Sequence, residues 1–394
     1  MISPFALTHK TTGRERAMPL ARALVQRGHR VRLLVPAWDD PAQAGRRWLD
    51  GGVRVECVPL PAPLLLRLPL LLARRAAHKT DVVHVFKPKA YAGLAASLLH
   101  LRHARWLLDH DDWEGRGGWN DANPYSTAQR RLFQWQEQTL PRQASAVTVA
   151  SRTLEAQVWG LGQQHTYYLP NGAERARYVP WLTAANPAAV AARRAELGLT
   201  NAPTVLLYTR FIEFGLDWLL AYLKRLAEQV VGVRLLVVGS GFFGEEATLL
   251  RAAAAAGLSA QVVHQPVAAG WLADGTLART LACADMAIFP MRDNLINRSK
   301  CSVRMIDALA MGLPLVADRV GQQAEYVAHN ETGLLVEPSD LAGFVAASSR
   351  LLHNPQLRTE FGLAAQVRLW RLFDWAQLAT IAEAAYRFVV DPSG

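Results

Sequence analysis

The sequence has few cysteines, no long apolar run and no clustered metal ligands. Cys57, Cys283 and Cys301 are far apart in a chain of 394 residues, which favours a reducing compartment and provides no disulfide framework. The 11 histidines are scattered, so we expect no structural metal. Charged residues make up only 19% of the chain and apolar residues 51%, a composition that excludes a disordered protein.

The chain also lacks a clear export signal or membrane span. No basic segment with a long apolar core opens the sequence, so we expect a cytoplasmic protein. The most apolar stretch, residues 58–73, is shorter than the ~18–20 residues that cross a bilayer, and it contains Arg67. Arg74, Arg75 and Lys79 follow it. Two interpretations stay open: an ordinary helix packed on a sheet, or a peripheral segment on the anionic inner face of a membrane.

Positive charge is concentrated in the first half. Residues 1–180 contain 25 Lys and Arg against 14 Asp and Glu, whereas residues 181–394 contain 18 against 19. A basic first half indicates an anionic partner bound by that half. We expect no nucleic acid, because no recognition motif or zinc spacing accompanies the charge.

Short apolar runs alternate with helix-length segments throughout, which predicts parallel sheets in an α/β protein. In the first half the expected strands are 2–7, 31–36, 53–58, 82–86, 105–109, 146–150 and 166–169, with a helix over 14–26. In the second half they are 205–209, 234–239, 260–264, 286–290, 315–317 and 334–336. The length and a polar, proline-bearing stretch near Pro180 predict domains over 1–180 and 181–375. These are two doubly wound, Rossmann-like units facing a central cleft.

Residues 281–338 hold the most informative pattern. An apolar strand ends at Pro290, a polar loop follows over 297–302, and a helix is expected over 303–311 before the turn Gly312-Leu313-Pro314. Such a loop exposes backbone N–H groups beside Arg298, Lys300 and Arg304, which is typical of a phosphate site.

This segment resembles the donor half of the family-4 glycosyltransferases, retaining enzymes of the GT-B fold. In that family two acidic residues separated by seven others precede an A-x-G-x-P-V-V-A turn, and a G-x-x-E loop follows. Here the corresponding acid is Glu325, with three residues between it and Gly321. Pro170-Asn171-Gly172 matches another family turn. The resemblance implies transfer of a hexose from a nucleotide-diphosphate sugar to an acceptor hydroxyl, with retention and without metal or cofactor. It also implies a C-terminal helix, here within 376–394, that returns to the first domain.

The resemblance assigns a donor site in the second half. Arg210 follows a strand and would hold the diphosphate; the family's lysine five residues on is missing, and Lys300 would compensate. Asp307 falls at the second acidic position, which binds the ribose, while Ser299 replaces the first acid. The glycines that follow strand 234–239 and the residue after the next strand complete the proposed contacts. The full donor set is Ser299, Cys301, Ser302, Asp307, Gly239, Gly241, Val267, Thr12 and Gly13.

The acceptor site would lie in the first half. The run LLDHDDWE ends a strand, and polar residues at such a place usually face the ligand. By resemblance His110 and Asp111 join Arg210 and Lys300 as catalytic residues. The predicted acceptor contacts, which fit a glycan, an anionic or lipid-linked molecule or another small molecule, are Lys10, Arg14, Asp109, Asp112 and Lys87. We interpret Asp109-His110-Asp111 as unrelated to the metal-binding Asp-x-Asp motif.

Three other functions remain to be separated from transfer. The loss of the lysine and of the first acid fits a nucleotide-sugar-binding protein with weak or no activity. The carboxylates at 109–112 fit a GT-B sugar-nucleotide epimerase. Gly239-Ser240-Gly241 suggests a dehydrogenase, but it is mid-chain and lacks the acid expected about 20 residues on. The leading prediction is a glycosyltransferase of cell-envelope polysaccharide or glycolipid synthesis.

Overall fold

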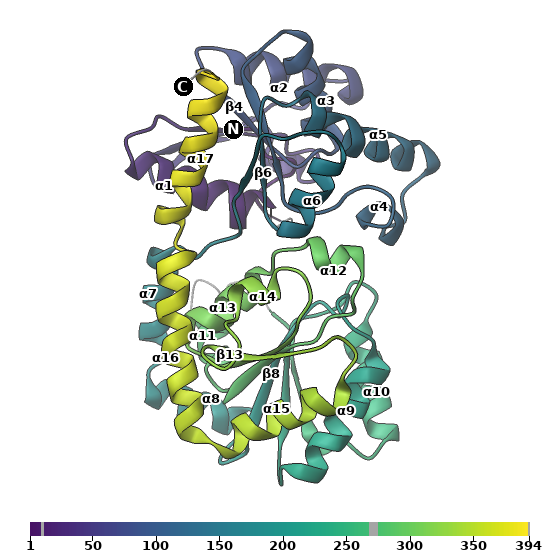
Figure 1. Cartoon of the computed structure of the whole chain (residues 1–394), viewed down its shortest axis with the longest axis vertical. Helices are drawn as coiled ribbons and strands as arrows, with labels where there is room; N and C mark the ends of the chain where they lie inside the picture. The colour runs from purple at the N-terminus through teal and green to yellow at the C-terminus, as the bar shows by residue number, and fades with distance from the viewer. Residues whose placement is uncertain (9–11, 268–274, 393–394) are drawn as a thin grey trace. The chain divides into compact units, whose positions relative to one another are not determined.

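The computed structural model describes residues 1–8, 12–267 and 275–392 (Figure 1). The chain forms two compact units. The first comprises Met1–Gly172, Arg298–Cys301 and Phe373–Gly394; the second comprises Ala173–Asn297 and Ser302–Leu372. Pro180, near which the sequence predicts a boundary, lies inside a helix of the second unit.

The first unit is an α/β unit with seven strands among its described residues. Its strands are β1 (Arg32–Val35), β2 (Arg47–Asp50), β3 (Val53–Cys57), β4 (Val83–Phe86), β5 (Trp106–His110), β6 (Val147–Val149) and β7 (Thr166–Tyr168). Its helices are η1 (a π-helix, Thr12–Ala17), α1 (Met18–Gln26), η2 (a 3-10 helix, Pro41–Gln43), α2 (Leu64–Ala77), α3 (Ala90–Leu101), α4 (Trp119–Ala122), α5 (Thr127–Gln143), α6 (Arg152–Gly160) and α17 (Trp375–Val390). Helix α17 lies beside α1 (Figure 1), and apolar side chains of both helices belong to one buried cluster with those of β1 and β3. Helix α1 contacts β3, whereas α17 contacts β5, β6 and β7.

The strand expected over 2–7 is reduced to one residue. Ile2 pairs in parallel with both Leu34 of β1 and Val85 of β4, so it joins the sheet order β1-β3-β2 to the order β4-β5-β6-β7. Pro4 stands two residues later and has no N–H to continue the ladder. The sequence analysis also missed β2, which pairs with β3 as the antiparallel edge of the sheet.

The described part of the second unit contains six strands and the helices that connect them. Its strands are β8 (Thr204–Tyr208), β9 (Arg234–Val238), β10 (Val262–Gln265), β11 (Met286–Phe289), β12 (Leu315–Asp318) and β13 (Gly333–Val336). Its helices are α7 (Arg175–Ala184), α8 (Pro187–Glu196), α9 (Leu216–Gln229), α10 (Glu245–Ala255), η3 (a 3-10 helix, Ser259–Gln261), α11 (Thr276–Leu281), α12 (Leu295–Ser299, whose last two residues belong to the first unit), α13 (Val303–Ala310), α14 (Gln323–Tyr326), α15 (Leu341–His353) and α16 (Pro355–Leu372).

The six strands run parallel in the order β10-β9-β8-β11-β12-β13. This is the doubly wound order of dinucleotide-binding sheets, whose ligands bind beyond the carboxyl ends of the strands near the point where the order reverses, here between β8 and β11. The strands are nearly continuous apolar runs because helices cover both faces, as a parallel sheet requires. All six predicted strands of this half are confirmed to within two residues.

The segment between β11 and α13 differs from expectation. The sequence predicts a loop over 297–302, but α12 occupies Leu295–Ser299. The Asn294 side chain accepts a hydrogen bond from the Asn297 N–H at 3.0 Å, which supplies the start of this short helix.

Within the described residues, no helix is both long and apolar enough to span a bilayer. The apolar stretch that drew attention in the sequence forms α2, which contains Pro69.

Candidate active site

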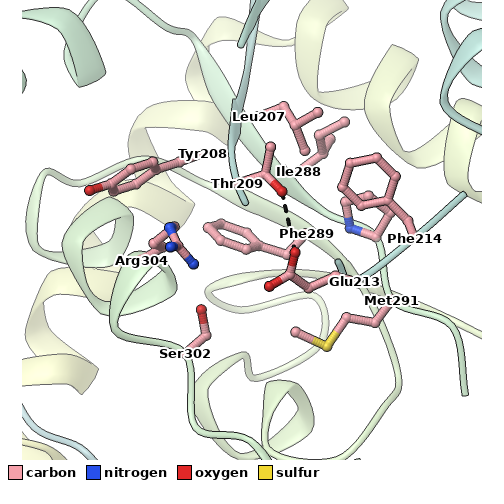
Figure 2. Close-up of a pocket in the computed structure, with 11 residues that line it drawn as sticks. Leu207, Tyr208, Thr209, Glu213, Phe214, Ile288, Phe289, Met291, Ser302 and Arg304 are labelled. Carbon is pink, nitrogen blue, oxygen red and sulfur yellow. Dashed lines mark hydrogen bonds between the residues drawn. The ribbon is translucent and has the colours of Figure 1, made fainter. Parts of the chain in front are cut away.

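A pocket lies at the carboxyl ends of β8 and β11 in the second unit (Figure 2). Both apolar strand residues and polar side chains from the following loops line it. The lining residues are Leu207, Tyr208, Thr209, Glu213, Phe214, Ile288, Phe289, Pro290, Met291, Ser302 and Arg304. This position in the sheet is the one at which doubly wound domains bind their ligands.

A strained turn shapes one wall of the pocket. After β8, Phe211 takes a left-handed conformation with φ 67°, which is costly for a residue with a side chain and concentrates at functional sites. The Thr209 hydroxyl accepts from the Phe211 N–H at 2.7 Å and donates to a Glu213 carboxylate oxygen at 3.3 Å (Figure 2). The turn therefore holds the Glu213 carboxylate at the pocket wall.

Two arginines of this region stack on aromatic rings. The Arg304 guanidinium carbon lies 5.5 Å from the centre of the Tyr208 ring, and that of Arg210 lies 5.4 Å from the Phe242 ring. Both arginines are half-buried. Arg304 follows Ser302, whose hydroxyl caps α13 by accepting from the Met305 N–H at 3.4 Å.

Asp307, the predicted ribose ligand, is buried in the second unit. One of its carboxylate oxygens accepts from the Tyr178 hydroxyl at 2.6 Å and from Arg177 at 3.3 Å. Both partners come from α7, a helix that the sequence analysis did not connect with this residue. These bonds anchor α7 to α13, so Asp307 has a structural role here besides the ribose contact that was predicted.

Asp318 is a buried acid that sequence analysis did not select. It ends β12 and accepts a hydrogen bond from the Met291 N–H at 2.6 Å. Burial raises the pKa of Asp318 to about 7, and the Met291 N–H opposes part of that rise. An apolar strand that stops at an acid was the only sequence signal for this residue.

The glycines after β9 allow close packing at positions where a side chain would clash. A side chain at Gly239, which has φ 114°, would come within 2.2 Å of the Thr209 carbonyl oxygen, and one at Gly241 would meet Glu245 at 2.0 Å. Gly239 therefore allows β8 and β9 to end side by side. Val267, predicted near the nucleobase, follows β10 and is 41% exposed.

Asp109 of the first unit is fully buried in an ion pair. Arg16 donates to both of its carboxylate oxygens, at 2.6 and 2.7 Å, and also to Asn171 and the Leu169 carbonyl. Thr148 donates to Asp109 at 2.6 Å. Burial alone would raise the pKa of this carboxyl, but Arg16 holds it below its ordinary value. Asp109 was predicted to contact the acceptor, yet these bonds occupy both of its oxygens.

Lys87 is surrounded by carboxylates. Its ammonium lies 2.9 Å from Asp112, 3.0 Å from Glu114 and 3.6 Å from Asp111. Burial lowers the pKa of Lys87, but the surrounding carboxylates hold it well above its ordinary value. The positive charge predicted to meet a phosphorylated acceptor is thus neutralised within the protein.

Asp111 has a perturbed environment. It accepts from the Thr12 hydroxyl at 2.8 Å. Burial raises the pKa of Asp111 to about 6, against the opposing charge of Lys87. Its neighbour His110 lies 2.5 Å from Glu137, and although burial favours neutral imidazole, Glu137 raises the pKa of His110. A buried acid near neutrality is one property expected of a catalytic group.

The loop after residue 8 is partly described. Lys10 lies outside the described residues. A side chain at Gly13 would come within 2.7 Å of Ser3 and 2.6 Å of Leu7, so this glycine permits close packing of η1. Arg14 is exposed and pairs with Glu15 at 2.8 Å.

Residues 298–301 belong to the first unit. The Ser151 hydroxyl donates to the Ser299 carbonyl at 2.8 Å, and the Asn171 amide donates to the Cys301 carbonyl at 2.9 Å. The Lys300 ammonium lies 5.8 Å from the centre of the Trp119 ring. Burial raises the pKa of Asp112, but Lys87, then a hydrogen bond from Trp119 and then Lys300 bring it below its ordinary value. The predicted cation pair is therefore divided, with Lys300 in the first unit and Arg210 in the second.

Comparisons with known proteins agree with this arrangement. The family model described as "Glycosyl transferase 4-like domain" matches residues 11–172, and the one described as "Glycosyl transferases group 1" matches residues 202–354. The chain is 28% identical over 357 residues to the GDP-mannose-dependent alpha-(1-6)-phosphatidylinositol monomannoside mannosyltransferase of Mycolicibacterium smegmatis. The match covers 89% of this chain and 87% of that protein.

Solved structures show the same fold. Sucrose-phosphate synthase from Thermosynechococcus elongatus superposes with a TM-score of 0.72 at 24% identity, over 96% of this chain and 93% of that one. HepE from Anabaena, in complex with UDP, gives a TM-score of 0.70 at 18% identity, over 97% and 98%. The two family models match one segment in each unit. The chain therefore belongs to the family-4, group 1 glycosyltransferases of the GT-B fold, and it is a glycosyltransferase that uses a nucleotide sugar.

Proposed function

We propose that the protein transfers a hexose, with mannose from GDP-mannose as the first candidate, to a hydroxyl of a lipid-linked acceptor on an anionic membrane surface. The mannosyltransferase relative supports this choice of donor and lipid class by its name. The transfer would retain the anomeric configuration and need no metal, as the family resemblance implies.

The chemistry depends on stabilising the leaving diphosphate. Negative charge grows on that group as the glycosidic bond breaks, and preorganised cations and N–H donors lower the barrier. Arg210 and the capped start of α13 supply such groups in the second unit. A phosphate oxygen would then remove the proton of the attacking hydroxyl, so the reaction does not require a separate carboxylate base in this pocket.

The proposal that the acceptor lies on a membrane surface rests on the exposed face of α2. Leu65, Leu66 and Leu70 are 60%, 66% and 44% exposed, although large apolar side chains at the surface are usually scattered singly. Arg67 and Arg74 are exposed between and beyond them. In the described part of the chain, neither arginine has a carboxylate within 4.0 Å, so their charges are available to anionic headgroups.

The opposite face of α2 packs into the unit. Leu68, Leu72, Ala73 and Ala76 are buried, and the helix contacts α3. The packed face fits the first interpretation that the sequence left open, and the apolar and basic character of the exposed face supports the second. An amphipathic helix of this kind binds in the plane of a membrane surface.

Vesicle flotation tests the membrane assignment. The full chain should float with phosphatidylcholine vesicles that contain phosphatidylglycerol and stay behind with phosphatidylcholine alone. Replacing Leu65, Leu66 and Leu70 with serine should abolish flotation. The double change Arg67→Glu and Arg74→Glu should do the same, because each basic residue contributes ~1 kcal/mol at an anionic surface.

The matched control changes another exposed apolar pair. Leu363 and Val367 of α16 are 61% and 65% exposed, and they lie on a helix of the second unit rather than on α2. Their replacement with serine should leave flotation unchanged. Equal flotation of the parent and both α2 variants would overturn the acceptor assignment.

A further inference from the structure

The donor pocket contains one cation. Among the residues that line it, Arg304 alone carries a positive charge and Glu213 alone a negative one. Figure 2 shows Arg304 between Tyr208 and Ser302, on the wall facing Glu213. The position matters because the family's lysine is missing: Gly215 stands five residues after Arg210.

Arg304 is held by a ring and by no counter-charge. Its guanidinium lies over Tyr208 at 5.5 Å, and within the described residues no carboxylate comes within 4.0 Å of it. Two other arginines of the same unit differ in this respect, since Arg177 pairs with Asp307 and Arg319 with Glu337. A guanidinium stacked on an aromatic face keeps its N–H edge directed away from the ring, where it can make two parallel bonds to an oxyanion.

The place of Arg304 in its helix also favours an anion. It is the second residue of α13, whose first turn contains no acidic residue. The positive end of the helix dipole disfavours a cation there. A bound phosphate would offset both the dipole and the arginine charge, and the same helix start offers it backbone N–H groups.

We infer that Arg304, positioned by Tyr208, is the second cation that binds the diphosphate of the donor, in the place that the missing lysine would occupy. Lys300, the compensating cation that the family resemblance implies, belongs to the first unit, where it lies over the Trp119 ring. The inference rests on the proposed donor site. It adds to that site Arg304 and Tyr208, two residues that the family motif does not contain.

Calorimetric titration tests the role of Arg304. The full chain would be titrated with GDP, with UDP and with the nucleosides guanosine and uridine. Arg304→Ala should weaken binding of the preferred nucleoside diphosphate about tenfold or more, because a hydrogen bond to a charged group is lost. Nucleoside binding should not change. The affinity of Arg304→Lys for the diphosphate should lie between those of the parent and Arg304→Ala, since lysine keeps the charge but loses the bidentate fork.

Tyr208 is tested as a positioning residue. Tyr208→Phe keeps the ring and should bind the diphosphate within about twofold of the parent, whereas Tyr208→Leu should weaken it severalfold. Arg319→Ala, which removes an exposed charge of the same unit, is the matched control and should bind like the parent. Thermal midpoints near that of the parent would show that each variant is folded.

The outcomes separate the two claims. A parent that binds GDP or UDP, with Arg304→Ala binding it equally well, would overturn the inference alone. An equal loss of nucleoside and diphosphate binding in Arg304→Ala would also overturn it, because the arginine would then shape the pocket without contacting phosphate. A parent that binds neither diphosphate would overturn the donor site itself.

Discussion

At the scale of single residues, the two units use charge differently. In the first unit two buried cations near the predicted acceptor residues are neutralised: Arg16 by Asp109, and Lys87 by the carboxylates around it. In the second unit Arg304 faces a pocket without such a partner among the described residues. A neutralised cation stabilises the protein's own fold, whereas an uncompensated one is available to a ligand.

The Asp109 carboxylate should therefore be structural. Asp109→Ala leaves Arg16 buried without its counter-charge, and the loss of one partner of a buried ion pair costs about 3–5 kcal/mol. Hydrogen exchange of the β5 and β6 amides should accelerate accordingly. Glu337→Ala removes the partner of the exposed Arg319 and should cost under ~1 kcal/mol. Unchanged exchange in Asp109→Ala would return this residue to the predicted acceptor site.

Asp318 should make stability depend on pH. Its pKa is raised by burial to about 7, so the folded state keeps a proton that the unfolded chain releases near its ordinary pKa of 3.8. The native state binds more protons between these values, and stability falls as pH rises from about 4 to 7.

Asp318→Asn should remove that fall. The amide oxygen can still accept from the Met291 N–H, and no charge is buried. Urea unfolding at pH 4, 5.5, 7 and 8 should show the variant more stable than the parent at the two higher values, with the gap closing toward pH 4. Parallel pH profiles for the two proteins would contradict the raised pKa.

At the scale of elements, apolar runs predicted most strands because a parallel sheet buries both faces of each strand. The misses have physical causes. Ile2 forms only a bridge because Pro4 ends the ladder, and β2 is an edge strand whose exposed residues leave no continuous apolar run. Helix α12 depends on a cap by Asn294 within a polar segment, and such a segment reads equally well as a loop.

Helix α16 contains a glycine whose replacement by alanine should destabilise the protein, although helix propensity alone would predict the opposite. Gly362 lies inside the helix, where alanine is usually more stable by ~0.5–1 kcal/mol. A Cβ there would come within 2.2 Å of the Gly312 carbonyl oxygen in the turn after α13. Gly362→Ala should thus destabilise the protein by about 1–3 kcal/mol, because backbone must move.

Gly160, the last residue of α6, provides the matched control. A Cβ at this position meets nothing within 4 Å, so Gly160→Ala should leave the thermal midpoint unchanged or slightly higher. The same measurement on Gly362→Ala should give a clear decrease. Equal midpoints for the two variants would show that α16 does not pack against that turn as described.

At the scale of the whole molecule, the sequence predicted the family, the GT-B fold and the transferase activity, and all three are confirmed. The site residues stay predictions. Their motif positions could be found from spacing, but their partners could not: Arg16 lies 93 residues from Asp109, and Tyr178 lies 129 residues from Asp307. The sequence placed Arg304 beside the predicted phosphate loop. Its contact with Tyr208 could not be predicted, because it depends on how β8 and α13 pack together.

Sugar transfer to lipid tests the account most directly. The full chain would be incubated with radiolabelled GDP-mannose, or with UDP-glucose, and anionic vesicles that contain phosphatidylinositol monomannoside. Label should enter the lipid phase with release of the nucleoside diphosphate, and the new linkage should keep the anomeric configuration of the donor. Donor that is consumed equally without the lipid, or label that never leaves the nucleotide, would contradict the proposed transfer.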